Sequence, residues 1–336
     1  METAFTWIDG ERLIRFGRGA IAMAPDLLAG RGFEPYVLLT TERAEAASPV
    51  LVQGAEAVLH VPSGPVPDAA DAVRHGVGGR TLVALGGGRV VDAAKAIAAA
   101  DGLSCAAVPT TLAGSAWTPF HRMPAGVKAS QLVRPALVVW DPDLIETLPR
   151  EDLVATAMNA LAHAFESLYA PLANPVGELA ALRAAELLGR ELPREQPDRE
   201  AVALAAMLGG YAVGAAGFAV HHAVCQTTVR TCGVAHAQTN AVVLPHSVRF
   251  MADRAPGAVG RFAVALGADG GDPVDAAGRV ARLSAETGVE GLAELGVDED
   301  AVPMIVEAIR AHPALGATPG GAPSDEELTA MLLSAL

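Results

Sequence analysis

The sequence predicts an α/β domain followed by an all-helical domain. Up to about residue 140, short apolar runs typical of strands alternate with helical runs, which is the α/β signature. After Pro149, residues 151–336 read as successive helices with no convincing strand. The length of 336 residues suits two domains, because single cores usually stop growing at about 250–300 residues. We therefore place a boundary at residue 150, between domains 1–150 and 151–336.

The first domain is expected to hold a Rossmann-like sheet, because strands joined through helices pair in parallel. Its strands are short runs that are mostly apolar. Strands are expected at 35–41, more weakly at 55–61, and at 81–85, 103–108 and 136–140, with helices at 67–76 and 90–100.

The second domain is divided by proline- and glycine-rich breaks. They fall at 171–175, 192–197, 267–273 and 313–323, and the loop 316–323 precedes a last short helix. The most apolar stretch, Gly209 to Cys225, contains four glycines and two histidines. This composition predicts a buried core helix rather than a membrane span.

The composition narrows the class of protein. The net charge of -14 disfavours nucleic acid as a partner, because an acidic surface repels phosphate. No Lys/Arg run resembles a membrane patch, and charges interrupt the first residues where a signal peptide would be apolar. Three cysteines without a C-x-x-C pair argue against a disulfide framework. We expect a reduced, cytoplasmic protein.

Two loops at the ends of neighbouring strands are candidates for binding a nucleotide. Gly86-Gly87-Gly88 lies between strand 81–85 and helix 90–100, where a helix N-terminus can hold phosphate. Its spacing is not G-x-G-x-x-G, and a tight turn would also require glycine. Pro109-Thr110-Thr111 follows the next strand, and simple turn chemistry also explains it. The two loops together favour binding more than either does alone.

A group of polar residues interrupts the apolar helices of the second domain. Asn159 and His163 lie four apart on one helical face, and His221-His222, His236 and His246 follow. Such a group can bind a divalent metal or can bind and protonate a substrate. The alternative is a set of unrelated, hydrogen-bonded core histidines.

Four collinear motifs resemble a known family. The segment GGGRVVDAAKAIA resembles the GGGSxxDxxK element of the iron-containing alcohol dehydrogenase superfamily. PTTLAGSAWTP, MNALAHAFESLYAPLANP and HHAVCQTTVRTCGVAHAQTNAVVLPH resemble elements of its maleylacetate reductase branch. The motifs run in order from about residue 80 to residue 250, and their order supports the assignment.

The resemblance implies a dinucleotide-binding domain and a helical substrate domain, in an architecture like that of dehydroquinate synthase. It implies NADH or NADPH as cofactor and the reduction of the maleylacetate double bond in aromatic-compound degradation. By position in the motifs, the cofactor-binding residues are Gly86, Gly87, Gly88, Asp92, Thr110, Thr111 and Ser115, with Lys128 matched by position alone.

The resemblance also implies the catalytic residues. The superfamily's metal site uses an Asp and three His, and the corresponding residues here are Asn159, His163, His222 and His236. Asn in place of Asp removes the anionic ligand, and a neutral amide is a poorer partner for Fe²⁺ or Zn²⁺. We expect no bound divalent metal, and we expect these four residues to position a substrate and supply a proton.

The sequence departs from the branch at several positions. Ala116 replaces Glu, Gln226 replaces His, and Val229-Arg230 replaces a glycine pair. Arg122, Lys128 and Arg230 could hold carboxylates, or could simply face solvent.

Three functional hypotheses follow from these observations. The main one is an NAD(P)H-dependent reductase that transfers hydride to an activated alkene or carbonyl of a small carboxylate. The alternative is non-redox chemistry, a dehydration, elimination or cyclisation in a biosynthetic pathway, and a third reading is a binding protein without turnover. A homodimer without nucleic-acid or membrane partners is expected.

Overall fold

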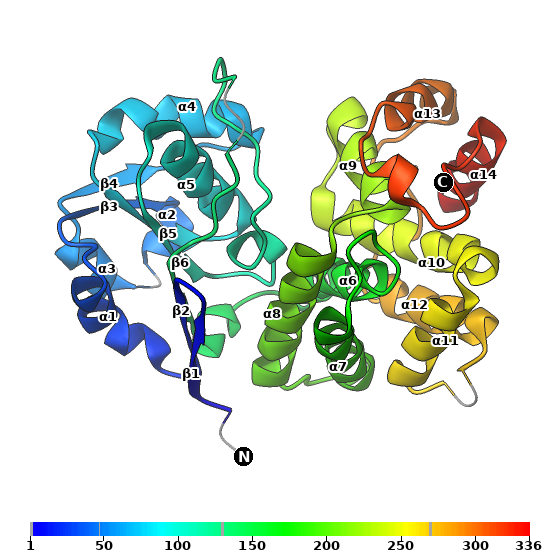
Figure 1. The fold of residues 1–336 in the computed structure, drawn as a ribbon, viewed down its shortest axis with the longest axis horizontal. Helices are drawn as coiled ribbons and strands as arrows, with labels where there is room; N and C mark the ends of the chain where they lie inside the picture. Colours follow the sequence, from blue (N-terminus) through cyan, green and yellow to red (C-terminus); the bar gives the residue numbers. More distant parts are fainter. Residues whose placement is uncertain (1–2, 47, 129–130, 269–270) are drawn as a thin grey trace. The chain divides into compact units, whose positions relative to one another are not determined.

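The computed structural model describes residues 3–46, 48–128, 131–268 and 271–336. It divides into two compact units, Met1–Leu148 and Pro149–Leu336, which Figure 1 draws in blue to green and in green to red.

The first unit is built on a seven-stranded sheet. The strand order is β1-β2-β7-β6-β5-β3-β4. β1 and β2 form an antiparallel hairpin, and the remaining neighbours pair in parallel. The five predicted strands are all present, while β1 and β2 were not predicted. The strands are β1 (Phe5–Asp9), β2 (Arg12–Phe16), β3 (Tyr36–Thr40), β4 (Ala57–His60), β5 (Thr81–Gly86), β6 (Cys105–Pro109) and β7 (Leu137–Trp140).

Helices cover both faces of this sheet (Figure 1). Alternate residues of the central strands, such as Leu38, Val83 and Val108, point to one side and join a core with Leu28 and Leu51. These two residues belong to α1 and α3, while α4 and α5 pack together on the other side. The helices are α1 (Ala24–Gly30), α2 (Glu42–Glu45), α3 (Pro49–Gly54), α4 (Val66–Val77) and α5 (Gly88–Asp101), with short 3-10 turns at η1 (Ala20–Met23), η2 (Gly114–Ala116) and η3 (Pro142–Ile145).

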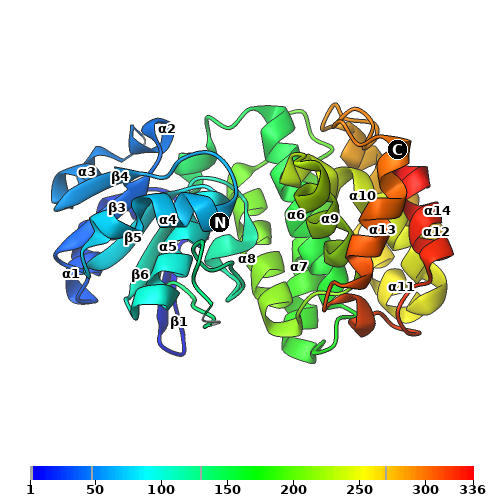
Figure 2. The ribbon, with the colours of Figure 1, turned by 90° about the horizontal axis from the view of Figure 1, so that it is seen from above.

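The second unit is a helical bundle, and its described residues contain no strand, as predicted. α6 lies in its middle and contacts α7, α8, α10 and α12, so nearly its whole circumference is buried (Figures 1 and 2). The helices are α6 (Arg150–Ser167), α7 (Pro175–Glu191), α8 (Arg199–Ala216), α9 (Val220–Cys232), α10 (His236–Arg254), α11 (Pro256–Ala265), α12 (Pro273–Ala285), α13 (Val302–Arg310) and α14 (Asp325–Ala335), with 3-10 turns at η5 (Glu299–Ala301) and η6 (Leu315–Ala317).

The apolar stretch Gly209 to Cys225 is not one helix, which corrects the prediction. α8 ends at Ala216, Gly217 has a φ of 87° that L side chains rarely adopt, and the chain restarts as α9. The two helices are bent by 102° at this break. Among the described residues, no single helix is long and apolar enough to cross a membrane, and this bent pair meets the test only by length and composition.

Candidate active site

The glycine loop connects β5 to α5 in the first unit. Gly87 is the residue before the first residue of α5. No side chain caps this helix, so the backbone N–H groups of its first turn have no hydrogen bond from a capping side chain. A Cβ on Gly87 would lie 3.2 Å from Thr111 Cγ2, and one on Gly88 would lie 3.0 Å from Ala113 Cβ. Glycine is therefore required here because a second loop packs directly against the first.

The two predicted binding loops lie side by side. The backbone N–H of Thr110 donates to the carbonyl of Gly86 at 3.0 Å, which extends the β5–β6 pairing into the loops. The structure thus brings together Gly86, Gly87, Gly88, Asp92, Thr110, Thr111 and Ser115. Lys128 is exposed, and no hydrogen bond or ion pair joins it to these loops within the described parts of the chain.

A buried lysine braces the two loops, and sequence reasoning did not single it out. Lys95 is fully buried, and its ammonium donates to Asp92 Oδ1 at 2.9 Å and to the carbonyls of Ser115 at 2.9 Å and Phe120 at 2.6 Å. Ser115 Oγ donates to the other oxygen of Asp92 at 2.9 Å. All three N–H donors of Lys95 are satisfied. The signal in the sequence was the Asp92-x-x-Lys95 spacing, which puts both side chains on one helical face.

In the second unit, α6 and α9 bring three of the predicted catalytic residues together. Asn159 and His163 lie one turn apart on α6, and His222 comes from the first turn of α9. The rings of His163 and His222 stack with centroids 4.9 Å apart and planes 9° apart. Burial lowers the pKa of His163, and the neighbouring His222 and His236 lower it further. These four residues, Asn159, His163, His222 and His236, are called the histidine cluster below.

The histidine cluster contains polar atoms that the protein itself leaves unsatisfied. Asn159 Oδ1, His163 Nδ1 and His222 Nε2 are buried and have no hydrogen-bond partner in the structure. A buried polar atom without a partner costs about 1–3 kcal/mol, so most are paired in native proteins. Three such atoms in one cluster are what a site for a polar ligand requires.

A buried carboxylate supports His222. His222 Nδ1 lies 2.6 Å from Glu166 Oε2, and the His222 backbone N–H donates to Oε1 at 3.3 Å. The Glu166 side chain is fully buried, and this burial raises its pKa to about 7. Sequence reasoning missed this residue, although an acid within the apolar part of α6, three residues after His163, was the available signal.

His236 is connected to the interior through an amide that was also not predicted. Asn240 Nδ2 donates to the His236 carbonyl at 2.8 Å and lies 3.2 Å from His236 Nε2. Its Oδ1 lies 3.1 Å from His221 Nε2, while His221 Nδ1 lies 2.9 Å from Ser247 Oγ. His221 is therefore a satisfied core histidine, and burial lowers its pKa to about 3.

His246 does not join the histidine cluster, which corrects its grouping with the other polar residues of the second domain. Its Nδ1 lies 2.8 Å from Ser334 Oγ on α14. The reason is its position on α10: His246 lies ten residues, or almost three turns, after His236 and faces another neighbour.

Two of the unusual residues extend from the cluster along α9. His222, Gln226 and Arg230 recur every four residues and share one face of the helix. Gln226 Oε1 accepts from Nε2 of His312 at 3.3 Å, because His312 Nδ1 already accepts from the Ala314 N–H at 3.2 Å. His312 thus approaches the position where the branch has a histidine, and it was not predicted.

The other departures are placed in the first unit. Ala116 is buried, and its carbonyl accepts from the guanidinium of Arg12 at 2.8 Å. Arg122 is exposed.

The histidine cluster lacks the anionic ligand that the superfamily's metal site has. The donors are one amide and three imidazoles, a set without an anionic ligand. Across the described ranges, no three His, Cys, Asp or Glu residues are arranged to hold a metal ion. The expected absence of a divalent metal stays a prediction for metal analysis.

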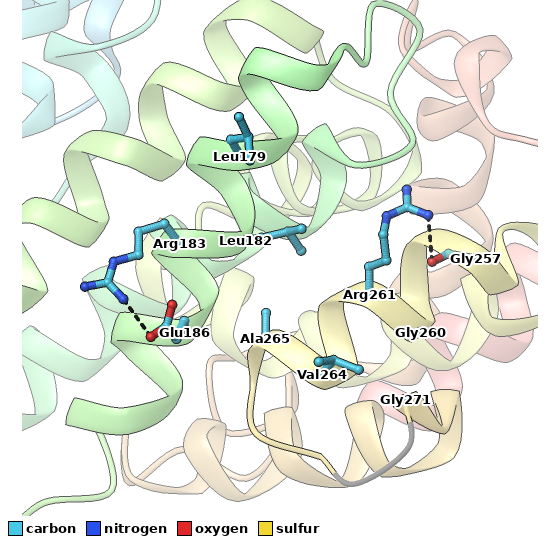
Figure 3. A pocket seen from close by; sticks show the side chains of 10 residues that line it. All are labelled: Leu179, Leu182, Arg183, Glu186, Gly257, Gly260, Arg261, Val264, Ala265 and Gly271. Atoms are coloured by element: carbon cyan, nitrogen blue, oxygen red, sulfur yellow. Dashed lines mark hydrogen bonds and ion pairs between the residues drawn. The ribbon is translucent and has the colours of Figure 1, made fainter.

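A groove in the second unit shares no lining residue with this cluster. It has a volume of about 740 Å³ and separates α7 from α11 (Figure 3). Its rim carries aliphatic side chains such as Leu179 and Val264, and its walls carry the ion pair between Arg183 and Glu186 at 2.6 Å. No predicted site residue lines it. The lining residues are Leu179, Leu182, Arg183, Glu186, Gly257, Gly260, Arg261, Val264, Ala265 and Gly271.

Comparison with known families covers both units. A model described as iron-containing alcohol dehydrogenase matches residues 12–142, and one described as the C-terminal part of the Fe-containing alcohol dehydrogenase family matches residues 153–336. The chain belongs to the iron-containing alcohol dehydrogenase family.

Within the iron-containing alcohol dehydrogenase family, the chain is similar to maleylacetate reductases. It is 36% identical to the maleylacetate reductase of Sphingobium indicum, an alignment that covers 95% of this chain and 93% of that protein. The crystal structure of maleylacetate reductase from Agrobacterium tumefaciens aligns with a TM-score of 0.83 at 27% identity, over 100% of this chain and 99% of that one. Sulfoacetaldehyde reductase from Bifidobacterium kashiwanohense, solved in complex with NAD⁺, shares the fold at 24% identity, with a TM-score of 0.82 over 96% of each chain.

These matches confirm the predicted superfamily, its maleylacetate reductase branch and the two-part architecture. The chain is an NAD(P)-dependent oxidoreductase that acts on a small molecule. The comparisons give no support to the non-redox alternative.

Proposed function

We propose that the chain reduces maleylacetate, or a closely similar unsaturated carboxylate, with NADH or NADPH. The observation that carries this proposal is the set of three unpartnered buried atoms, Asn159 Oδ1, His163 Nδ1 and His222 Nε2, in a member of the maleylacetate reductase branch.

The first unit is the proposed dinucleotide-binding domain. The close packing at Gly87 and Gly88 and the uncapped first turn of α5 fit a pyrophosphate, because free N–H groups at a helix N-terminus bind anions. Thr110, Thr111 and Ser115 belong to the second binding loop, on the other side of the proposed dinucleotide site. Lys95 and Asp92 hold this loop in place through their hydrogen bonds to Ser115. Lys128 is proposed as a cofactor-binding residue from its position in the sequence and not from a motif. When bound, NAD(P)H supplies the hydride.

The second unit is the proposed substrate domain, and its histidine cluster does the remaining work. Adding hydride to an activated double bond leaves negative charge on the substrate, which must be stabilised and then protonated. Asn159 and His163 offer hydrogen bonds, and His222 Nε2 is a buried atom that can take up a proton and then pass it to the substrate. Dry surroundings strengthen each of these interactions.

The test is the loss of NADH and of NADPH absorbance with maleylacetate under steady-state conditions. We expect turnover with at least one of the two cofactors. Absence of turnover with both, at high enzyme concentration and with a correctly folded sample, would reject this substrate. Acceptance of a ketone lacking the carboxylates at equal kcat/KM would reject the carboxylate requirement.

We also propose a homodimer and a cytoplasmic location. Val176 and Leu179 on α7 and Val264 on α11 expose aliphatic surface that a second copy would cover. The three cysteines are free, as expected for a reducing compartment. Light scattering should give twice the mass of the chain, and a monomeric mass at micromolar concentration would contradict the dimer.

A further inference from the structure

Glu166 connects two helices of the second unit at the histidine cluster. It lies on α6, and its carboxylate faces the first turn of α9, where no cap-residue side chain is present to accept hydrogen bonds. Backbone N–H groups of Ala219, His221 and His222 all interact with this carboxylate. The positive end of α9 and these donors favour the ionised carboxylate, whereas burial opposes it.

The contact with the imidazole decides which nitrogen of His222 is presented to a ligand. When Glu166 is ionised, its carboxylate can only accept, so at 2.6 Å it is His222 Nδ1 that donates to Glu166 Oε2. The neutral ring then has a bare Nε2, which is the atom without a partner. The ring plane is held as well, because it stacks on His163 at 4.9 Å and on Phe218 at 4.3 Å.

We propose that Glu166 is a positioning residue for the reaction, which holds His222 in the tautomer and orientation that present Nε2 to the substrate. This inference rests on the proposed function, because it assumes that the histidine cluster is where substrate binds. Partners of this kind fix a ring by hydrogen bonding to its distant nitrogen.

The experiment compares Glu166→Gln and Glu166→Leu with a matched control, Glu191→Gln. Glu191 is also a buried carboxylate in this unit, bonded to Arg190 Nε at 2.7 Å and to the Asp198 N–H at 3.1 Å, but it lies on α7 outside the cluster. We expect kcat for maleylacetate to fall about 10–100-fold in Glu166→Gln, and further in Glu166→Leu, with KM changed by less than about threefold. Glu191→Gln should keep the wild-type kcat.

The amide variant distinguishes positioning from a merely structural role. Its carbonyl oxygen can still accept from His222 Nδ1, so it should retain more kcat than Glu166→Leu even where the two melt at the same temperature. Wild-type kcat in folded samples of both Glu166 variants would overturn the proposal. So would kcat losses in both variants that only follow their loss of folded protein.

A spectroscopic measurement covers the case in which the Glu166 variants fail to fold. In wild-type enzyme labelled with ¹⁵N-histidine, at mildly alkaline pH, the His222 signal should show a protonated Nδ1 and a bare Nε2. That signal is assigned by its absence from the His222→Gln spectrum. A bare Nδ1 would overturn the proposal. If the wild type does not turn over maleylacetate, the proposed function fails, and this tautomer still decides the inference.

Discussion

At the scale of single residues, we expect Lys95 to contribute strongly to the stability of the first unit. Replacing it by methionine conserves volume but leaves the carbonyls of Ser115 and Phe120 and one oxygen of Asp92 without their donor. We expect Lys95→Met to lower the free energy of unfolding by about 3–5 kcal/mol, as for other broken buried ion pairs. Urea unfolding measures this change.

The control for Lys95→Met is an exposed ion pair. Arg183 pairs with Glu186 with both side chains about half exposed, so Arg183→Met should change stability by less than about 1 kcal/mol. Equal losses of stability in the two variants would show that the buried hydrogen bonds of Lys95 contribute no more than an exposed ion pair.

Gly88 should matter for the cofactor more than for the fold. A methyl group there would lie 3.0 Å from Ala113 Cβ and 3.1 Å from Ser115 Oγ, so the second loop must shift. We expect Gly88→Ala to weaken NAD(P)H binding about tenfold, equivalent to about 1.4 kcal/mol. Fluorescence titration checks this, with Gly30→Ala as control, because nothing lies within 4 Å of a Cβ at Gly30. Unchanged affinity would argue against cofactor binding at this loop.

At the scale of elements, the close approach of α8 to α6 fixes the position of the histidine cluster. A Cβ on Gly209 would lie 2.6 Å from the Ala160 carbonyl oxygen, which is backbone and cannot swing away. We expect Gly209→Ala to cost about 1–3 kcal/mol of stability and to lower kcat, since α6 carries Asn159 and His163.

The matched control lies in the interior of another helix. Gly278 in α12 has only the end of the Arg282 side chain near its would-be Cβ, at 3.7 Å. Gly278→Ala should therefore stabilise the protein by up to about 1 kcal/mol through helix propensity. Thermal melts of both variants decide the matter, and a stabilised Gly209→Ala would contradict the packing argument.

The elements that sequence patterns predicted are those whose partners are local. Apolar runs marked β3 and β5 to β7, and glycine and proline marked most helix ends. β2 was not predicted because its buried face includes Arg12, and a charged residue in a sequence usually indicates a position that faces solvent. The partners of Arg12, the carbonyls of Pro135 and Ala116, lie more than 100 residues away in sequence, where no local pattern can indicate them.

The candidate site shows the same limit. The motif resemblance gave Asn159, His163, His222 and His236, because these residue types stand at recognisable spacings. Glu166 and Asn240 were missed, because a single acid or amide on a helix is usually exposed. Only the packing of α6, α9 and α10 shows that both are buried against histidines.

At the scale of the whole molecule, buried titrating groups should make the protein sensitive to acid. The pKa values of His163, His221 and His222 lie below their ordinary value because these rings are buried, so below about pH 6.5 the unfolded chain binds protons that the folded chain does not. The free energy of unfolding therefore decreases as the pH is lowered, by up to about 1.4 kcal/mol per pH unit for each histidine.

Glu166 acts in the opposite sense. Its pKa is raised to about 7, so its contribution favours the folded state at low pH and is lost as pH rises from its ordinary value toward 7. With three histidines opposed by one carboxyl group, the net fall between about pH 6 and pH 5 should be about 2–3 kcal/mol, and it should be steeper in Glu166→Gln, which lacks the opposing group. Urea unfolding across this range checks both slopes, and a flat profile in the wild type would contradict the assignment of these histidines as buried and neutral.

Metal analysis of the purified enzyme tests whether the histidine cluster binds a divalent metal. Because the donor set has no anionic ligand, we expect well below one equivalent of Fe²⁺ or Zn²⁺ per chain and unchanged kcat after dialysis against a chelator. Stoichiometric metal whose removal abolishes turnover would show that Asn159 and the three histidines bind metal despite their neutrality.

The brace formed by Asp92, Lys95 and Ser115 also limits how this chain can change. Replacing Lys95 or Ser115 removes a donor from the carboxylate of Asp92, and replacing Asp92 removes the partner of both side chains. The backbone carbonyl of Ser115 also accepts from Lys95, so the conformations of the two loops depend on each other. The two segments must be inherited as a unit. A protein engineer who transplants the glycine loop without residues 109–120 would transfer a buried ammonium group stripped of two of its three acceptors.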